Sequence, residues 1–265
     1  MLKIKVKYII IFLIIFCSCN NFNNPTDGIK IEGNIENSQD CSHISGIRVN
    51  AYNYADNYLT KISESKYENN YFSLFLPYEL KNKYCSAINE WGLFDTKFES
   101  YLTISNKNVK ISKISLWSIN EEHANDIQQF GYAEMYNNDI VSVTLVKTKY
   151  IYAQSAVSIK GEYESYVAGT EKEGIFCPKT VKVDLLLQKG WNIIYNIGNF
   201  VPKPNTDFWV MNSATLNITT AKPENIELKW YYNCALVLNI LRNNTHYLFQ
   251  PYMGGYDTDF IINQY

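Results

Sequence analysis

Cysteine is the residue type whose positions in this chain carry the most chemical information. Six cysteines occur, and two of them, Cys17 and Cys19, directly follow an apolar run at residues 8–16. That run has the length of a signal-peptide apolar region and is too short for the roughly 20 residues that cross a bilayer. Three lysines and no acidic residue precede it, at residues 1–7. The beginning of the chain therefore predicts export.

The segment Phe16-Cys17-Ser18-Cys19 resembles the lipobox of bacterial lipoproteins, which has a large apolar residue, two small residues and then the acylated cysteine. Cys19 fits because Ser18 precedes it, whereas a lipid on Cys17 would put bulky Phe16 at a position that must be small. Phe16 departs from the leucine that is commonest in the motif. The resemblance implies a signal peptide at residues 1–18, a palmitate-type lipid on Cys19 and a lipidated tether at residues 19–28.

Two or three acyl chains would anchor the protein firmly, because each buried methylene group contributes about 0.8 kcal/mol. Asn20 stands where an aspartate would resemble an inner-membrane retention signal, which favours the outer membrane and leaves open which face. The alternatives are a plain cleaved signal peptide, an uncleaved anchor and a buried core helix. The short apolar run disfavours the second, and the asparagine-rich segment after it disfavours the third.

Four cysteines remain after cleavage and lipidation: Cys41, Cys85, Cys177 and Cys234. An even number of cysteines in an oxidising compartment is typical of disulfide bonding, and four allow three pairings. Two lie in each half of the chain, so we expect Cys41–Cys85 and Cys177–Cys234. Four buried free thiols are the alternative.

No residue pattern predicts a catalytic site, a metal site or a cofactor. The three histidines, His43, His123 and His246, are far apart and lack metal-ligand spacing. No nucleophile elbow, phosphate-binding glycine loop or calcium loop is present. Carboxylates such as Glu162 and Glu164 could meet across strands as in a glycosidase, although a solvated face is the commoner outcome. We therefore expect a protein that is not an enzyme.

Tryptophans are the remaining candidates for ligand contact, because an indole ring stacks well on a sugar or another flat group. Trp209 follows a proline-containing loop and is the best single candidate for stacking. Core packing is the alternative for most of the five tryptophans, which are Trp91, Trp117, Trp191, Trp209 and Trp230.

The charge of the chain excludes a nucleic-acid partner. The formal net charge is −2, and removal of residues 1–18 leaves 21 basic side chains against 26 acidic ones. Only two of the basic residues are arginines, Arg48 and Arg242. A nucleic-acid binder needs a concentrated basic face that neutralises phosphates, and no such concentration is visible in the sequence.

Short alternating segments from residue 29 onward predict an all-β fold. Residues 29–35 and 46–52 alternate with a period of two, and Asn69-Asn70 predicts a turn into a strand at residues 71–76. With Gly33, Gly46-Ile47-Arg48-Val49 and the strand ending at Pro77, this order resembles the carboxypeptidase-regulatory-like, transthyretin-like sandwich. The resemblance implies a mostly non-catalytic module at residues 29–118.

A polar stretch at residues 119–131 predicts a boundary, followed by a second β-domain at residues 125–265. The segment Leu187-Gln188-Lys189-Gly190-Trp191-Asn192 predicts a tight hairpin, with Gly190 at positive φ. Together with Leu228-Lys229-Trp230-Tyr231-Tyr232 it resembles the C-terminal β-domain of uncharacterised bacterial lipoproteins. The fold class expected is thus all-β, with two sandwich-like domains.

These observations predict a membrane-anchored envelope lipoprotein that acts by binding or assembly. Its lipid would be its contact with the membrane, and an envelope protein or a glycan would be its partner. A carbohydrate- or host-ligand-binding surface lipoprotein is the first alternative, and an envelope hydrolase is the second.

Overall fold

The computed structural model describes residues 28–36, 43–53, 58–88, 100–119, 126–137, 140–167, 177–202 and 211–232. Nearly all regular structure within these ranges is β-strand, and the 3-10 turn η2 spans Asn82–Tyr84. The all-β fold class is confirmed. The signal peptide and nearly all of the tether lie outside the described residues.

Fourteen strands join in one mixed sheet in the described part of the chain. They are β1 (Ile29–Asn34), β2 (Gly46–Asn53), β3 (Tyr58–Glu68), β4 (Tyr71–Leu76), β5 (Ser86–Ala87), β6 (Leu102–Ile104), β7 (Lys110–Ile119), β8 (Asp126–Asn137), β9 (Ile140–Ala153), β10 (Val157–Val167), β11 (Cys177–Leu187), β12 (Gly190–Pro202), β13 (Met211–Thr219) and β14 (Lys229–Tyr232).

The turn predicted at Asn69-Asn70 is confirmed. Both asparagines have positive φ, 54° and 63°, and they join β3 to β4. Two central residues with positive φ are the mark of the hairpin turn whose twist matches that of its strands. Asparagine tolerates this conformation better than most residues that carry a side chain, so the turn forms without glycine.

One part of the sheet closes into a ring of strands. Pairing runs from β1 through β4, β3, β2, β7 and β8 to β14, and a parallel bridge between Ile35 and Trp230 joins the two ends. Trp230 Nε1 donates to the carbonyl oxygen of Glu32 at 3.1 Å. Gly33 lies under this indole, where a Cβ would clash with the ring. A glycine in the first strand thus lets the last strand close the ring.

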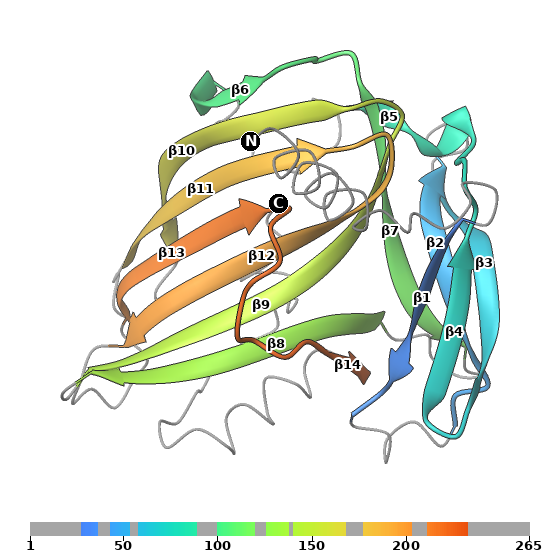
Figure 1. The fold of residues 1–265 in the computed structure, drawn as a ribbon, viewed down its shortest axis with the longest axis horizontal. Coiled ribbons are helices and arrows are strands. Elements are labelled where there is room, and N and C mark those ends of the chain that lie inside the picture. Colours follow the sequence, from blue (N-terminus) through green and yellow to red (C-terminus); the bar gives the residue numbers. More distant parts are fainter. Residues whose placement is uncertain are drawn as a thin grey trace, which may run out of the picture.

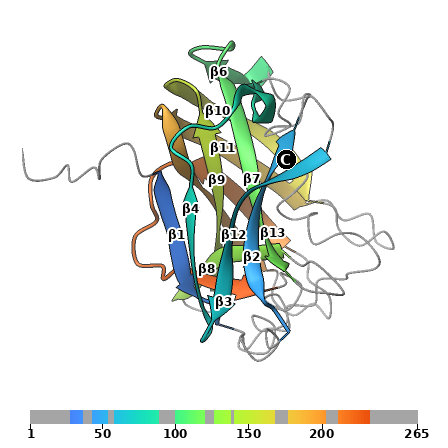
Figure 2. The same ribbon diagram turned by 90° about the vertical axis from the view of Figure 1, so that its right-hand side faces the viewer.

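Inside the ring is a core that we call the aromatic cluster, because seven of its members are Tyr, Phe or Trp. Its buried members are Ile31, Ile35, Ile44, Ile47, Val49, Ala51, Tyr67, Phe72, Leu74, Leu76, Leu80, Tyr84, Cys85, Ile114, Leu116, Ile127, Tyr150, Tyr152, Trp230 and Tyr232. Figure 2 shows β1, β4, β3 and β2 as one layer in front of the remaining strands, a sandwich-like arrangement.

A second core, the aliphatic cluster, is covered by the curved part of the sheet, in the order β9-β12-β13-β11-β10-β6. Its buried members are Ile88, Leu102, Val109, Ile111, Ile151, Ala153, Val157, Ile159, Tyr163, Val181, Val183, Leu185, Leu187, Ile194 and Ile218. This region lies on the left in Figure 1, and β7, itself a strand of the ring, borders it.

Strands β7 and β9 serve both cores because side chains alternate across a strand. On β9, Tyr150 and Tyr152 belong to the aromatic cluster, whereas Ile151 and Ala153 belong to the aliphatic cluster. The hydrogen-bonded pairing and both cores therefore cross the boundary expected near residues 119–125. The division into separately folding domains at residues 29–118 and 125–265 stays a prediction, and a single cooperative unit is the outcome that this sharing favours.

The hairpin predicted at residues 187–192 is wrong in its pairing. Gln188 and Lys189 do connect β11 to β12, and Gly190 has the expected positive φ of 98°. However, β13 lies between these two strands, parallel to β11 and antiparallel to β12. The side chain of Asn192 holds the connection in place. Its Oδ1 accepts from the backbone N–H of Gln188, and its Nδ2 donates to the backbone carbonyl oxygen of Gln188, both at 2.8 Å. The local sequence predicts the bend correctly. The strand that separates β11 from β12, however, is β13, which comes from a later segment of the chain.

Candidate functional site

The sheet has an opening where β7, β8 and β9 diverge. The β7–β9 ladder ends at the pair Lys113–Ile151, and the β7–β8 ladder begins at the pair Leu116–Ile127. Along β8, the β8–β9 ladder begins only at the pair Phe130–Lys147. Short stretches of all three strands therefore lie between the ends of the three ladders, namely residues 114–115, 128–129 and 148–150.

A cavity of about 370 Å³ occupies this junction. Its described lining residues come from six strands and are Tyr52, Leu59, Lys113, Ile114, Ser115, Leu116, Trp117, Ile127, Gln128, Gln129, Lys147, Thr148, Lys149, Tyr150 and Trp230. The volume lies within the range of about 300–1,000 Å³ that is usual for small-ligand sites. We call it the junction cavity.

The inner part of the junction cavity reaches the aromatic cluster. Five lining residues are members of that cluster: Ile114, Leu116, Ile127, Tyr150 and Trp230. The rings of Tyr150 and Trp230 are stacked, with centroids 6.2 Å apart and planes 9° from parallel. Burial, with a smaller contribution from nearby Tyr195, raises the pKa of the Tyr150 hydroxyl. Tyr150 therefore stays neutral at physiological pH.

Three lysines line the junction cavity. Lys147 and Lys149 on β9 are only 6% and 7% exposed, whereas Lys113 on β7 is exposed. The ammonium group of Lys147 also lies 5.6 Å from the centroid of the Phe130 ring. Almost fully buried lysines are rare because an ammonium group loses its hydration on burial. None of the described lining residues is a carboxylate.

Neutral polar groups complete the lining. The Thr148 hydroxyl donates to Gln129 Oε1 at 3.2 Å, which links β9 to β8 across the opening. The indole nitrogen of Trp117 donates to the Ser115 hydroxyl at 2.7 Å, which fixes the position of that ring. Half-buried Tyr52 and exposed Leu59 lie on the β2–β3 side. The cavity thus offers ammonium, amide and hydroxyl groups beside flat aromatic surfaces.

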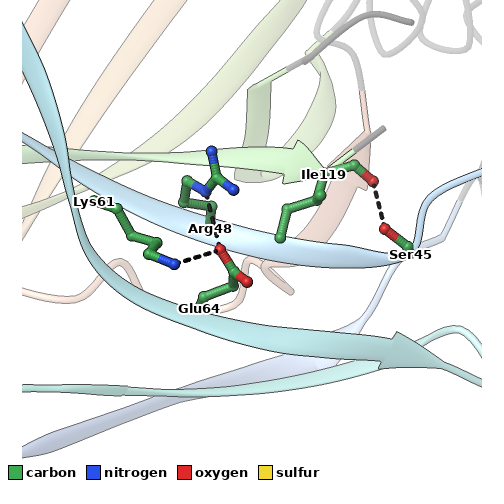
Figure 3. Close-up of polar contacts among 5 residues, drawn as sticks. All are labelled: Ser45, Arg48, Lys61, Glu64 and Ile119. Carbon is green, nitrogen blue, oxygen red and sulfur yellow. Dashed lines mark hydrogen bonds and ion pairs between the residues drawn. The ribbon is translucent and has the colours of Figure 1, made fainter. Parts of the chain in front are cut away.

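An ion-pair group lies next to the junction cavity, on β2 and β3 (Figure 3). Glu64 accepts from Arg48 Nε at 3.0 Å and from Lys61 Nζ at 3.2 Å. These bonds, that of Arg48 foremost, hold the pKa of the Glu64 carboxyl below its ordinary value. Arg48 is the cross-strand partner of Trp117 and therefore shares its face of the sheet. Two cations against one carboxylate leave this neighbouring surface positive.

The start of β2 is also tied to the end of β7. The hydroxyl of Ser45 donates to the carbonyl oxygen of Ile119 at 3.2 Å, and the Ser45 amide donates to the same oxygen at 3.0 Å. Figure 3 shows this contact on the right, away from the group formed by Arg48, Lys61 and Glu64. It holds β2 and β7 together along one side of the junction.

Most of the site residues predicted from the sequence lie outside the described part of the chain. These are the lipidation site Cys19, the stacking candidate Trp209, and two of the cysteines, Cys41 and Cys234. The backbone of Cys177 is in β11, but its side chain is not described. The pairing Cys177–Cys234 therefore stays a prediction, whereas the pairing Cys41–Cys85 is not formed in this structure, in which Cys85 is a free thiol.

Cys85 is the one cysteine whose side chain the structure describes. It is a buried free thiol in the aromatic cluster, and its Sγ is 3.9 Å from the carbonyl oxygen of Lys81. Burial raises the pKa of this thiol to about 11. The thiolate is therefore scarce at neutral pH, and Cys85 is a poor nucleophile where it lies.

The described tryptophans have three different environments. Trp230 is buried in the aromatic cluster, and Trp191 packs against that cluster while its Nε1 donates to the carbonyl oxygen of Pro77 at 2.7 Å. Core packing thus accounts for these two. Trp117 is half-buried and lines the junction cavity.

The lysines of the junction cavity were not singled out from the sequence, although a signal was present. In the segment Lys147-Thr148-Lys149-Tyr150-Ile151, strict alternation puts both lysines on the face of Ile151. Charged residues in the buried register of a strand are unusual and indicate a polar interior. Finding the cavity itself would have required knowledge of which strands diverge.

Among the described residues, no group of three or more His, Cys, Asp and Glu side chains could hold a metal ion. No helix in the same residue ranges is long and apolar enough to cross a membrane. No family model, curated protein or solved structure matches the chain.

Proposed function

We propose that this chain is an exported, lipid-anchored binding protein and that the junction cavity is its ligand site. The cavity is the observation that carries the proposal. Its described lining residues all lie on strands of one continuous sheet, so backbone pairing holds them in place. A preformed concave site with a few polar groups among apolar ones is the usual form of a small-ligand site.

Binding is favoured over catalysis by the chemistry of the lining. The described lining residues supply ammonium, amide, hydroxyl and indole groups, which orient and hold a ligand. Hydrolysis of a glycoside needs two carboxyl groups on either side of the bond, and acyl transfer needs a nucleophile beside a base. The proposal therefore keeps the expectation that the protein is not an enzyme.

The proposed anchor rests on the first nineteen residues. A lipid on Cys19 would place the sheet in the cell envelope, most simply at the outer membrane, with residues 20–28 as the polar tether. In the native host, Cys19→Ala should abolish incorporation of labelled palmitate and leave the unprocessed precursor. Continued labelling of this variant would contradict the assignment of the lipid to Cys19.

The ligand site is tested by filling the cavity. Mature protein without lipid, residues 20–265, is screened against a library of small molecules by thermal shift, and a true ligand raises the melting temperature. Ser115→Phe puts a bulky ring into the junction cavity and should abolish the shift. The matched control, Thr103→Phe, adds the same ring at an exposed position on β6 and should leave the shift unchanged. A shift that survives Ser115→Phe, or a library without any ligand, would reject the proposal.

A further inference from the structure

We infer that the junction cavity binds an uncharged sugar unit. This inference rests on the proposed function, because it names the ligand class of the same site. A sugar ring has an apolar face of C–H groups and a rim of hydroxyl groups, each of which both donates and accepts hydrogen bonds. The lining of the cavity contains a counterpart for each of these two features.

The counterpart of the apolar face is a set of aromatic rings. Trp117 on β7 is half-buried and lines the cavity. Its indole N–H donates to the Ser115 hydroxyl, so less side-chain freedom is lost when a ligand binds against the ring. Half-buried Tyr52 belongs to the same lining, and the stacked rings of Tyr150 and Trp230 lie toward the aromatic cluster. Such rings offer the flat apolar surface on which the C–H face of a sugar packs.

The counterpart of the hydroxyl rim is a set of neutral polar side chains, one from each of the three diverging strands. They are Ser115 of β7, Gln129 of β8 and Thr148 of β9. The Thr148 hydroxyl donates to Gln129 Oε1, which joins two of them across the opening. The amide nitrogen of Gln129 carries two N–H donors, and a hydroxyl oxygen has two lone pairs that accept. Side chains that donate and accept match a ligand hydroxyl, which does the same.

The charged groups of the lining are already engaged within the protein. Lys113, Lys147 and Lys149 each interact with other groups of the chain, and for Lys147 these include the Phe130 ring. None of the described lining residues is a carboxylate, so they do not supply the pair of carboxyl groups that cleaves a glycosidic bond. Recognition therefore depends on the rings and the neutral polar groups, which favours an uncharged sugar that is held and not hydrolysed.

The test measures binding to mature residues 20–265 by isothermal titration calorimetry. The probes are the methyl glycosides of glucose, galactose, mannose, fucose, xylose and N-acetylglucosamine. Cyclohexanol is the matched apolar probe, a six-membered ring with a single hydroxyl, and glucuronate is the charged one. We expect saturable binding of at least one methyl glycoside and at least about tenfold weaker binding of cyclohexanol, which forms fewer hydrogen bonds. Glucuronate should bind no more tightly than methyl glucoside.

Three variants assign the binding to the junction cavity. Trp117→Ala should weaken binding of the best glycoside by about tenfold or more, because a stacked ring is lost. Trp117→Phe keeps a flat ring at the same position and should retain most of the affinity. Gln129→Leu, which is similar in size, should weaken binding several-fold. The control is Phe75→Ala, which removes an exposed ring from β4, away from the cavity lining, and should leave the affinity unchanged.

Circular dichroism melts show whether each variant folds, and Gln129→Leu decides the matter if Trp117→Ala does not. Cyclohexanol that binds as tightly as the glycosides would overturn the sugar inference, as would an affinity unchanged in both Trp117→Ala and Gln129→Leu. Loss of sugar binding in Trp209→Ala but not in Trp117→Ala would place the sugar site outside the cavity and also overturn it. If no glycoside binds, the inference is wrong, and the library screen decides the binding function separately.

Discussion

The two cores of this protein differ in composition, and the candidate site adjoins only one of them. The aliphatic cluster consists of Ile, Leu, Val and Ala with a single tyrosine, whereas the aromatic cluster contains seven aromatic side chains. Five members of the aromatic cluster line the junction cavity, and no member of the aliphatic cluster does. Small branched side chains fill a curved sheet closely, while large rings at the edge of a core leave space between strands.

The contrast between the core and the candidate site is also visible along the single strand β9. On one face of β9, Ile151 and Ala153 belong to the aliphatic cluster. The two preceding residues on that face are Lys149 and Lys147, which line the junction cavity. The face changes from apolar to cationic at the point where β7 leaves β9. We propose that the aliphatic cluster mainly stabilises the fold, whereas the opening beside the aromatic cluster is the proposed ligand site.

The largest expected effect comes from separating the strands that the two cores share. Residues 28–118 alone would lose β8 and β14, which close the ring around the aromatic cluster, and β9, which contributes Tyr150 and Tyr152 to that cluster. We therefore expect this fragment to show no cooperative melt by circular dichroism, whereas mature residues 20–265 melt in one transition. A fragment that melts cooperatively with a β-type spectrum would contradict the shared cores and support two separate domains.

The next largest effect tests the ring closure. Trp230→Ala removes a buried indole that bonds to Glu32 and covers Gly33. The free energy of unfolding should fall by about 3–5 kcal/mol, as for other buried aromatic truncations. Leu185→Ala in the aliphatic cluster should cost about 2–5 kcal/mol without changing ligand binding. Phe75→Ala, at an exposed position, is the control; a Trp230→Ala loss no larger than the control's would contradict the closure.

Several elements could be predicted from the sequence because their signals are local. Alternation gave the strands that became β2 and β4, and Asn69-Asn70 gave the turn between β3 and β4. Ring closure was not predictable, since the bridge joins Ile35 to Trp230 from opposite parts of the chain. Alternation shows which residues share a face but not which strand lies alongside. For the same reason, the insertion of β13 between β11 and β12, and the divergence that opens the junction cavity, had no local signal.

A smaller effect tests the bend on the side of the aliphatic cluster. Gly190 has a φ of 98°, and a Cβ added there would meet no atom within 4 Å. Gly190→Ala therefore carries only the conformational cost of a left-handed backbone, about 1–2 kcal/mol in a chemical denaturation measurement. Gly190→Asn should cost less, because asparagine adopts positive φ more readily. Equal stability of Gly190→Ala and the wild type would show that the bend relaxes.

The smallest effect concerns the ion pairs beside the junction cavity. The Glu64 side chain is more than a third exposed, so the loss of stability in Glu64→Gln at pH 7 should be below about 1 kcal/mol. Because Arg48 and Lys61 lower the pKa of Glu64 in the folded state, their contribution is present above the ordinary carboxyl pKa of 4.5. It is lost as pH falls through the lower, folded-state pKa. Melts at pH 7 and pH 3 should therefore show a difference between Glu64→Gln and wild type that shrinks on acidification.

The most direct test of the account is a titration of ¹⁵N-labelled mature protein with the tightest ligand from the screen, followed by amide chemical shifts. We predict that the shifted amides cluster at residues 113–117, 127–129 and 147–150, which surround the junction cavity. Amides of β10 and β11, which cover the aliphatic cluster, should stay in place. Saturable shifts confined to β10 and β11, or to any surface away from the three-strand junction, would contradict the assignment of the cavity as the ligand site.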